Sequence, residues 1–321
     1  MGHYILLEQL AVNGANARAG FTYGFPAPTS FLGFTHSLSR HLKPLTGMNL
    51  TGCAIFSHST HVRASSDGFV NFNQRKSSHS TLKTKSKTAF TKNPSIIEEA
   101  KMDMVVSLLI ECDTPIPTNE SRLESLAQQI KEFIYKNRLS GGFINDVKMI
   151  HLLNNVEVKK IKPFIANTSV LTDASYLLEQ RINDLKAQGT YTNNFDAWTD
   201  FFANKKIAVK NAQDKVEWIQ KTIEHKKGWI VPLMVGYKAI SDIYQPNEVD
   251  SLRDNRYPFR MVESIYGLGE WKRGFMVQDI NSLIWRYQTA DNFYLCQQAD
   301  ASATTDDQTE LDEIYQEYDY F

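Results

Sequence analysis

The chain has 321 residues, of which 42% are hydrophobic and 12% aromatic, with 35 Lys and Arg against 36 Asp and Glu. This composition excludes an intrinsically disordered chain and is typical of a globular protein with a full hydrophobic core. No apolar run is long enough to cross a bilayer and the N-terminus lacks signal-peptide features, so we expect a cytoplasmic protein without membrane contact. The scattered cysteines, which also indicate a reducing compartment, are Cys53, Cys112 and Cys296.

The near-zero total charge hides a strong segregation along the chain. Nine acidic and no basic residues follow Arg286, so residues 1–286 hold 35 basic and 27 acidic side chains. A basic body is typical of a protein that binds a polyanion such as nucleic acid, although a merely charge-segregated soluble protein would show the same pattern. The acidic tail, residues 298–321, is expected either to solubilise the protein or to dock on a basic surface.

The N-terminal half alternates strand-like and helix-like segments. Prolines 26 and 28 open the first helix, for which we expect Thr29 or Ser30 as the N-cap. The β-α-β-β-α-β order is that of ferredoxin-like folds and RNA-recognition modules, so we predict an α+β protein with a ferredoxin-like core over residues 1–155. Its expected strands cover 4–12, 53–64, 102–112 and 143–153, and its second helix covers 120–137.

A basic excursion separates the second and third expected strands. Residues 68–97 contain six basic residues and no acidic one. Because these two strands are neighbours in a ferredoxin-like fold, residues 66–98 would project as a hairpin or loop. If the excursion forms a β-ribbon, its lysines would lie along one edge and could contact a phosphate backbone. The alternative is a solvated loop rich in Ser and Thr. The candidate contacts are Arg75, Lys76, Lys83, Lys85 and Lys87.

Residues 156–227 change to charged, helix-like sequence. We predict that they form a helical insertion beside the sheet. The expected helices cover residues 176–187, 196–204 and 213–227.

Residues 228–297 are apolar and strand-like again, and we expect a β-rich C-terminal part that packs on the core. An arginine-rich loop leads into a strand over residues 261–266, which we expect to end in a glycine-containing turn at 267–271. Four apolar side chains are expected in the core: Phe31, Phe34, Leu38 and Trp229.

No complete catalytic constellation occurs in the sequence. There is no phosphate-binding or dinucleotide-binding glycine motif, and His58 and His61 would point to opposite faces of a strand, which disfavours zinc binding. His36 has the chemistry of a general acid or base for RNA cleavage, but its place on an apolar helix face favours a structural role. We therefore expect no metal, no cofactor and no enzymatic activity.

Three sequence blocks carry a specific family resemblance. They are NGANARAGFTYGFPAPTSFLGFTHSL at 13–38, GWIVPLMVGYKAISDIY at 228–244 and RDNRYPFRMVESIYGLGEW at 253–271. Together with Arg138-x-x-Gly141-Gly142, they resemble the Csy-two (Cas-five-type) subunit of the type I-F CRISPR surveillance complex, Cascade. The match runs in order to about residue 297.

The resemblance implies a fold and a role. Members belong to the RAMP superfamily, are non-catalytic in this subtype, pair with the large subunit and hold the 5′ handle of the CRISPR RNA next to a Cas-seven-type backbone subunit. Target DNA is then recognised by the assembled complex through guide pairing. Two alternatives stay open at this point: a RAMP endoribonuclease that processes precursor RNA, and a protein-only scaffold that grips an acidic partner.

Two clusters in the matched blocks suit single-stranded RNA. Unstacked bases need aromatic or guanidinium stacking and amide edges, and a glycine-rich loop lets the backbone approach RNA closely. We expect the two clusters to meet over one handle. The first contains Asn13, Asn16, Arg18 and Tyr23, and the second contains Arg253, Arg256, Arg260 and Trp271.

Overall fold

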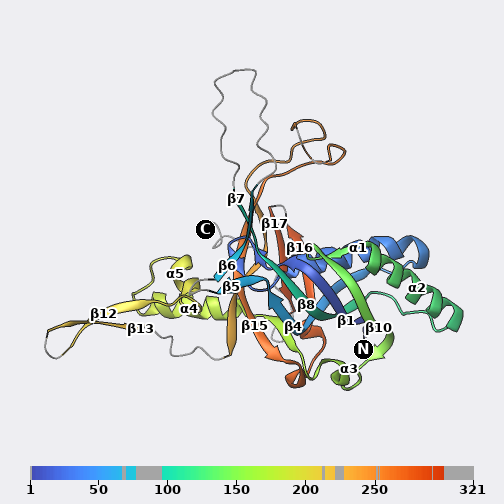
Figure 1. Cartoon of the computed structure of the whole chain (residues 1–321), viewed down its shortest axis with the longest axis horizontal. Coiled ribbons are helices and arrows are strands. Elements are labelled where there is room, and N and C mark those ends of the chain that lie inside the picture. Colours follow the sequence, from blue (N-terminus) through green and yellow to red (C-terminus); the bar gives the residue numbers. More distant parts are fainter. Residues whose placement is uncertain are drawn as a thin grey trace.

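The computed structural model describes residues 2–66, 70–76, 96–211, 214–220, 228–250, 252, 254–290 and 292–299. The fold is α+β, with a large antiparallel sheet and few helices (Figure 1). Within these ranges, no helix is both long and apolar enough to cross a membrane.

The elements follow one another closely along the chain. The first half contains β1 (Gly2–Asn16), β2 (Arg18–Ala19), β3 (Thr22–Tyr23), α1 (Pro28–Thr46), β4 (Leu50–Val62), β5 (Ala64–Ser66), β6 (Val70–Lys76), β7 (Ile96–Glu99), β8 (Lys101–Cys112), α2 (Glu120–Lys136), β9 (Arg138–Leu139) and β10 (Gly142–Val156). The second half contains α3 (Val158–Ile165), β11 (Ser169–Asp173), α4 (Ser175–Ala187), α5 (Asn194–Thr199), β12 (Lys206–Lys210), β13 (Val216–Gln220), β14 (Trp229–Ala239), β15 (Val262–Arg273), η1 (Gly274–Met276), η2 (Asn281–Leu283), β16 (Trp285–Ala290) and β17 (Phe293–Gln298).

Four strands of the first half lie in the order β10-β1-β8-β4, and every neighbouring pair is antiparallel. Helices α1 and α2 share one core cluster with this sheet, to which α1 contributes Phe31 and Leu38 and α2 contributes Leu126 and Ile130. Figure 1 shows the two helices together at one end of the molecule. The six predicted elements of this half are therefore confirmed in type and order.

The start of α1 differs from the prediction. Ala27 is the N-cap and makes no side-chain capping bond, so Thr29 and Ser30 are wrong as caps. Pro28 occupies the first helical turn instead. Its fixed φ angle suits that position and its missing N–H would have had no intrahelical partner, so the helix can begin without a polar cap.

The second half forms a ring of strands that closes on β4. The order β11-β15-β14-β17-β16-β4 is completed by a further pairing of β11 with β4. Strand β8 pairs with one edge of β4. The other edge of β4 is shared by two strands: β16 pairs with it at Cys53 and β11 pairs with it at Phe56. The buried indole of Trp285 donates from Nε1 to the carbonyl oxygen of Leu171, 3.0 Å away, and so links β16 to β11.

The predicted helix over residues 213–227 is wrong wherever the structure describes it. Residues 216–220 form β13, which pairs antiparallel with β12. The run Val-Glu-Trp-Ile-Gln is rich in β-branched and aromatic side chains, which favour a strand when a partner is present. Helix α4 matches the expected 176–187 closely, and α5 is shorter than the expected 196–204.

The predicted turn at 267–271 is also wrong, because these residues lie inside β15. Gly269 pairs with Asp173 of β11 and with Val231 of β14. A Cβ atom there would lie 3.1 Å from a methyl carbon of Leu171 and of Leu233. Glycine is therefore used here for close packing within a strand, not for chain reversal.

Three of the four expected core residues, Phe31, Phe34 and Leu38, are buried, whereas Trp229 is 64% exposed. Trp229 begins β14 and pairs with Trp271 of β15, with ring centroids 6.3 Å apart. The prediction that Trp229 is a core residue is wrong because this end of β14 is not covered by another element of the described chain.

The ring is also joined to β8 by an ion pair, and this pair predicts a pH dependence of stability. Arg286 donates from Nε and Nη2 to the Glu111 carboxylate at 2.9 and 2.6 Å, and Thr51 donates to Oε2. Burial alone would raise the pKa of Glu111, but the hydrogen bonds from Arg286 and Thr51 outweigh it and hold the pKa below its usual value. Such a carboxylate contributes stability above its unfolded-state pKa and loses it as the pH falls through the lowered value.

Glu111→Gln is accordingly expected to be less stable than the wild type at neutral pH, with the difference shrinking between about pH 5 and pH 3. Urea unfolding followed over a pH series measures this. Glu124→Gln, an exposed position on α2, is the control and should track the wild type. A constant offset between Glu111→Gln and wild type across the series would contradict the prediction.

Candidate nucleic-acid interface

A short hairpin follows β1 and is fixed on the second half of the protein. It comprises β2, β3 and their turn, residues 18–23, and we call it the N-terminal hairpin. The ring of Phe21 packs on Tyr266 of β15 at 3.9 Å between centroids and edge-on to Trp198 of α5 at 5.7 Å. Gly20 has a φ of 59°, and a Cβ there would meet the Tyr266 hydroxyl, so only glycine fits this turn.

The outer side of this hairpin combines aromatic and cationic groups. Phe21 is 57% and Tyr23 56% exposed. The exposed Arg18 donates from Nε to the carbonyl oxygen of Gly20 at 2.7 Å, which leaves its terminal nitrogens to other acceptors. Tyr23 also meets Phe72 of β6 edge-on at 5.5 Å. The N-terminal hairpin therefore connects β15 with the base of the basic excursion.

A pocket of about 400 Å³ opens beside the N-terminal hairpin, and we call it the aromatic pocket. The indole nitrogen of Trp198 donates to the carbonyl of Gly267 at 2.7 Å, so this ring is held in one orientation. Flat aromatic walls with a few polar groups suit a planar ligand such as an unstacked base. The lining residues are Phe21, Phe195, Trp198, Lys238, Glu263, Ser264, Ile265 and Tyr266.

A second polar patch surrounds the end of β1. Lys101 of β8 donates from Nζ to the Asn16 side-chain oxygen at 2.8 Å. Arg138 of β9 lies with its guanidinium 4.2 Å from the ring centre of Phe143, its cross-strand partner in β10. Asn13 pairs with Phe143 across β1 and β10, so exposed amide, guanidinium and aromatic groups lie on neighbouring strands.

The structure shows the partners that three predicted residues of the second cluster have within the protein. Arg260 donates from Nε to the Ser241 carbonyl and from Nη2 to Asn292, and thus braces the loop between β14 and β15. Arg256 is 80% exposed and forms a two-pronged ion pair with Asp254. Trp271 is half-buried against Phe25, edge-on at 4.9 Å.

The two predicted clusters meet β15 at different points. The N-terminal hairpin packs at Tyr266, inside the strand. Of the second cluster, Trp271 also lies inside β15, whereas Arg256 and Arg260 lie in the loop before β15 begins. Arg75 and Lys76 belong to β6, whose backbone pairs with Ile97 and Ile96 of β7. Lys83, Lys85, Lys87 and Arg253 lie outside the described residues.

Sequence reasoning missed Phe21, Lys101, Arg138 and Phe143 as interface candidates. Arg138-Leu139 and Gly142-Phe143 pair across the two-residue turn Ser140-Gly141, and a hairpin turn predicted at these two residues would have placed Arg138 opposite Phe143. The environment of Phe21 and Lys101 depends on β15 and β1, which are distant in sequence, so no local signal was available.

Two histidines considered in the sequence, His36 and His58, make polar contacts within the fold. His36 lies 2.9 Å from the hydroxyl of Tyr287 through Nδ1, so the structure supports its expected hydrogen-bonding role. His58 lies 2.7 Å from the Ser107 hydroxyl, and burial lowers the pKa of His58. Ser107 is fully buried, which keeps it from any macromolecular substrate. Among the residues that the structure describes, no group of three His, Cys, Asp or Glu could hold a metal ion.

Glu8 lies on the same sheet and receives contacts from β10. Lys148 donates to one carboxylate oxygen at 2.5 Å, and His151 lies 2.8 Å from the other. Although burial would raise the pKa of Glu8, these two contacts hold it below the usual range. The carboxylate is thus kept ionised as the anion of an internal ion cluster.

Comparisons with known proteins agree with the sequence blocks. The family model described as "CRISPR-associated protein (Cas_Csy2)" matches residues 5–296. The chain is also similar to the CRISPR-associated protein Csy2 of Pseudomonas aeruginosa (strain UCBPP-PA14), with 26% identity over 307 residues that cover 88% of this chain and 90% of that protein.

Proposed function

The chain belongs to the Csy2 family of CRISPR-associated proteins, and we propose that it is the subunit of type I-F Cascade that holds the 5′ handle of the CRISPR RNA and pairs with the large subunit. In this proposal the subunit is non-catalytic and contributes to RNA-guided recognition of foreign DNA. The antiparallel order β10-β1-β8-β4, with α1 and α2 on one face, supports a ferredoxin-like RAMP core.

The observation that carries the proposal is the N-terminal hairpin. It presents Arg18, Phe21 and Tyr23 to solvent, yet its own position is fixed by packing on Tyr266 and Trp198. Single-stranded RNA with splayed bases is bound by aromatic rings on which bases stack and by cations that meet phosphates. Because the hairpin is already held in place, its aromatic rings lose little conformational entropy when RNA binds, and this favours affinity.

The aromatic pocket and the patch at the end of β1 extend this surface in two directions. With a volume of about 400 Å³, the pocket has room for one unstacked base next to Phe21. Asn16, Lys101 and Arg138 supply an amide and two cations for base edges and phosphates. The basic excursion is joined to the same surface through the Tyr23–Phe72 contact, in accordance with a role in contacting the RNA backbone or a neighbouring subunit.

Arg18→Ala, Tyr23→Ala and Arg256→Ala are each expected to weaken binding of handle RNA by about 1–3 kcal/mol. Each removes one stacking surface or one cation. The measurement is fluorescence anisotropy with labelled RNA whose handle sequence is taken from RNA recovered from the native complex. Phe275→Ala is the matched control, because Phe275 is 60% exposed on η1, which packs on α3 near the start of β1, whereas the N-terminal hairpin follows the end of β1.

Thermal unfolding of each variant verifies that the protein is folded at the assay temperature. If the three variants bind handle RNA like the wild type at moderate salt, the proposed interface is wrong. Cleavage of repeat RNA by the purified protein without metal, abolished by His36→Ala, would establish the endoribonuclease alternative instead.

A further inference from the structure

A separate two-stranded ribbon projects from the molecule. It consists of β12 and β13, and we call it the arm. All ten residues of its strands are exposed. In Figure 1 the arm extends away from the sheet on the side opposite α1 and α2. Two strands on their own are only marginally stable in water, so a projecting arm with apolar side chains calls for a binding partner.

The register of the arm divides its side chains between two faces. Ala208 pairs with Trp218, Lys206 with Gln220 and Lys210 with Val216, and these side chains share one face, which we call the tryptophan face. The other face carries Ile207, Val209, Glu217 and Ile219. The acidic residue of the two strands thus lies on the face away from Trp218.

The tryptophan face has the layout of a stacking platform between two cations. Trp218 is 68% exposed, and its cross-strand partner Ala208 is too small to cover an indole ring. The diagonal neighbours of Trp218 on β12 are Lys206 and Lys210, within reach of long side chains. Lys210 pairs with Asp214 at 2.7 Å, but both groups are highly exposed, so a phosphate can replace that carboxylate at little cost.

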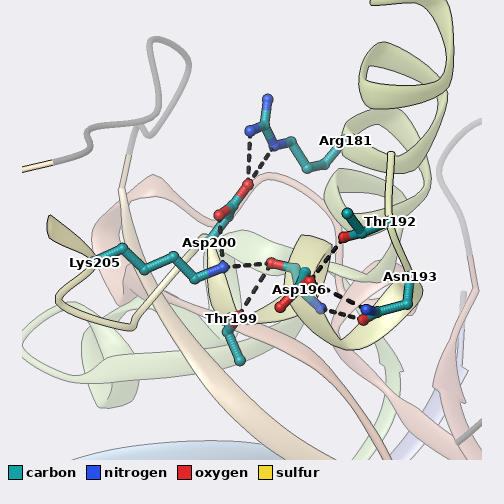
Figure 2. A network of polar contacts seen from close by, with 7 residues as sticks. All are labelled: Arg181, Thr192, Asn193, Asp196, Thr199, Asp200 and Lys205. Carbon is teal, nitrogen blue, oxygen red and sulfur yellow. Dashed lines mark hydrogen bonds and ion pairs between the residues drawn. The ribbon is translucent and has the colours of Figure 1, made fainter. Parts of the chain in front are cut away.

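The base of the arm is held by a network of buried charges on α4 and α5, shown in Figure 2. Asp200, whose side chain is 2% exposed, accepts hydrogen bonds from Arg181 at 3.0 and 2.6 Å and from Lys205 at 2.8 Å. Lys205 also donates to the carbonyl of Asp196 at 2.7 Å and directly precedes β12. The network therefore anchors the residue from which β12 leaves the body, which limits the freedom of this strand before binding.

We propose that the arm binds single-stranded nucleic acid, with a base stacked on Trp218 and the flanking phosphates on Lys206 and Lys210. Stacking on an exposed aromatic ring between cations is a sequence-tolerant mode of binding single strands, and a duplex would not offer the face of a base. Lysine is depleted at the centre of protein–protein interfaces, which argues against a protein on this face. The site is distinct from the N-terminal hairpin and does not rest on handle recognition.

The test uses the full-length protein and short labelled single strands without the handle sequence, one of RNA and one of DNA. Trp218→Ala is expected to weaken binding by about 5- to 100-fold, and Trp218→Phe, which keeps a ring, by much less. Lys206→Gln with Lys210→Gln should lower the slope of log K against log salt by about 1.4. The strand bound more tightly identifies guide RNA or unpaired DNA as the natural ligand.

Ile219→Ala is the matched control on the opposite face and should bind these strands like the wild type. Unchanged binding by Trp218→Ala would overturn the proposal. Equal losses in Trp218→Ala, Trp218→Phe and Ile219→Ala would also overturn it, because they would report a disturbed arm. Loss of association with another protein subunit in Trp218→Ala, with strand binding intact, would assign this face to a protein.

Discussion

Replacing Trp285 with alanine is expected to lower the free energy of unfolding by about 3–5 kcal/mol. Trp285 is fully buried, and its backbone pairs with Cys53 where β16 meets β4. The alanine variant would leave a large cavity at the closure of the strand ring. The Leu171 carbonyl would lose the indole donor but keep Gln298, whose amide nitrogen lies 3.2 Å away. The cost therefore comes mainly from lost packing.

Urea unfolding at neutral pH measures this effect through the midpoint and slope of the transition. Trp285→Phe should lose less, because most of the ring volume is kept. Trp229→Ala is the matched control, since Trp229 is 64% exposed, and it should stay within about 0.5 kcal/mol of the wild type. Similar losses for Trp285→Ala and Trp229→Ala would show that the ring closure does not depend on Trp285.

Arg181→Met is expected to cost about 3–5 kcal/mol, since it leaves the buried carboxylate of Asp200 without its two-pronged partner. Methionine keeps much of the apolar stem of arginine, so the loss reports the charge and hydrogen bonds. Lys205 remains, but a single ammonium satisfies only one side of the carboxylate. Unfolding of the α4–α5 region would also release the base of the arm.

The chain offers a matched comparison for this variant. Arg256 also donates from Nε and Nη2 to a carboxylate, one nitrogen to each oxygen of Asp254, but the Arg256 side chain is 80% exposed. Arg256→Met is therefore expected to leave the midpoint of the same urea unfolding experiment nearly unchanged. If the two arginine variants lose equal stability, burial does not govern the strength of the Asp200 network.

Elements with a strong local pattern could be read from the sequence. The apolar run of β8 and the three- and four-residue spacing of Leu126, Ile130 and Phe133 in α2 report which side of each element faces the core. The family blocks were equally local, since the Csy2 resemblance rests on contiguous motifs that the family match over residues 5–296 confirms. Local patterns of this kind persist whatever the element packs against.

Pairing between distant segments could not be read in the same way. Residues 267–271 carry two glycines and were predicted to turn, but β11 and β14 hold them extended on both sides. Residues 216–220 were predicted as helix, yet β12 supplies a strand partner. Local propensity contributes a fraction of a kcal/mol per residue, and tertiary pairing and burial outweigh it.

The same distinction between local pattern and distant packing applies to the candidate interface. From the sequence one could read which residue types gather near the first strand and before β15, and this led to the expectation of a nucleic-acid surface. The packing of distant segments was needed to show that Arg260 braces a loop, that Phe21 packs on Tyr266 beside a pocket, and that Trp218 is exposed between two lysines. The physical reason is that exposure and contact depend on neighbours far away in the chain, whereas composition and periodicity record only the local balance of polar and apolar side chains.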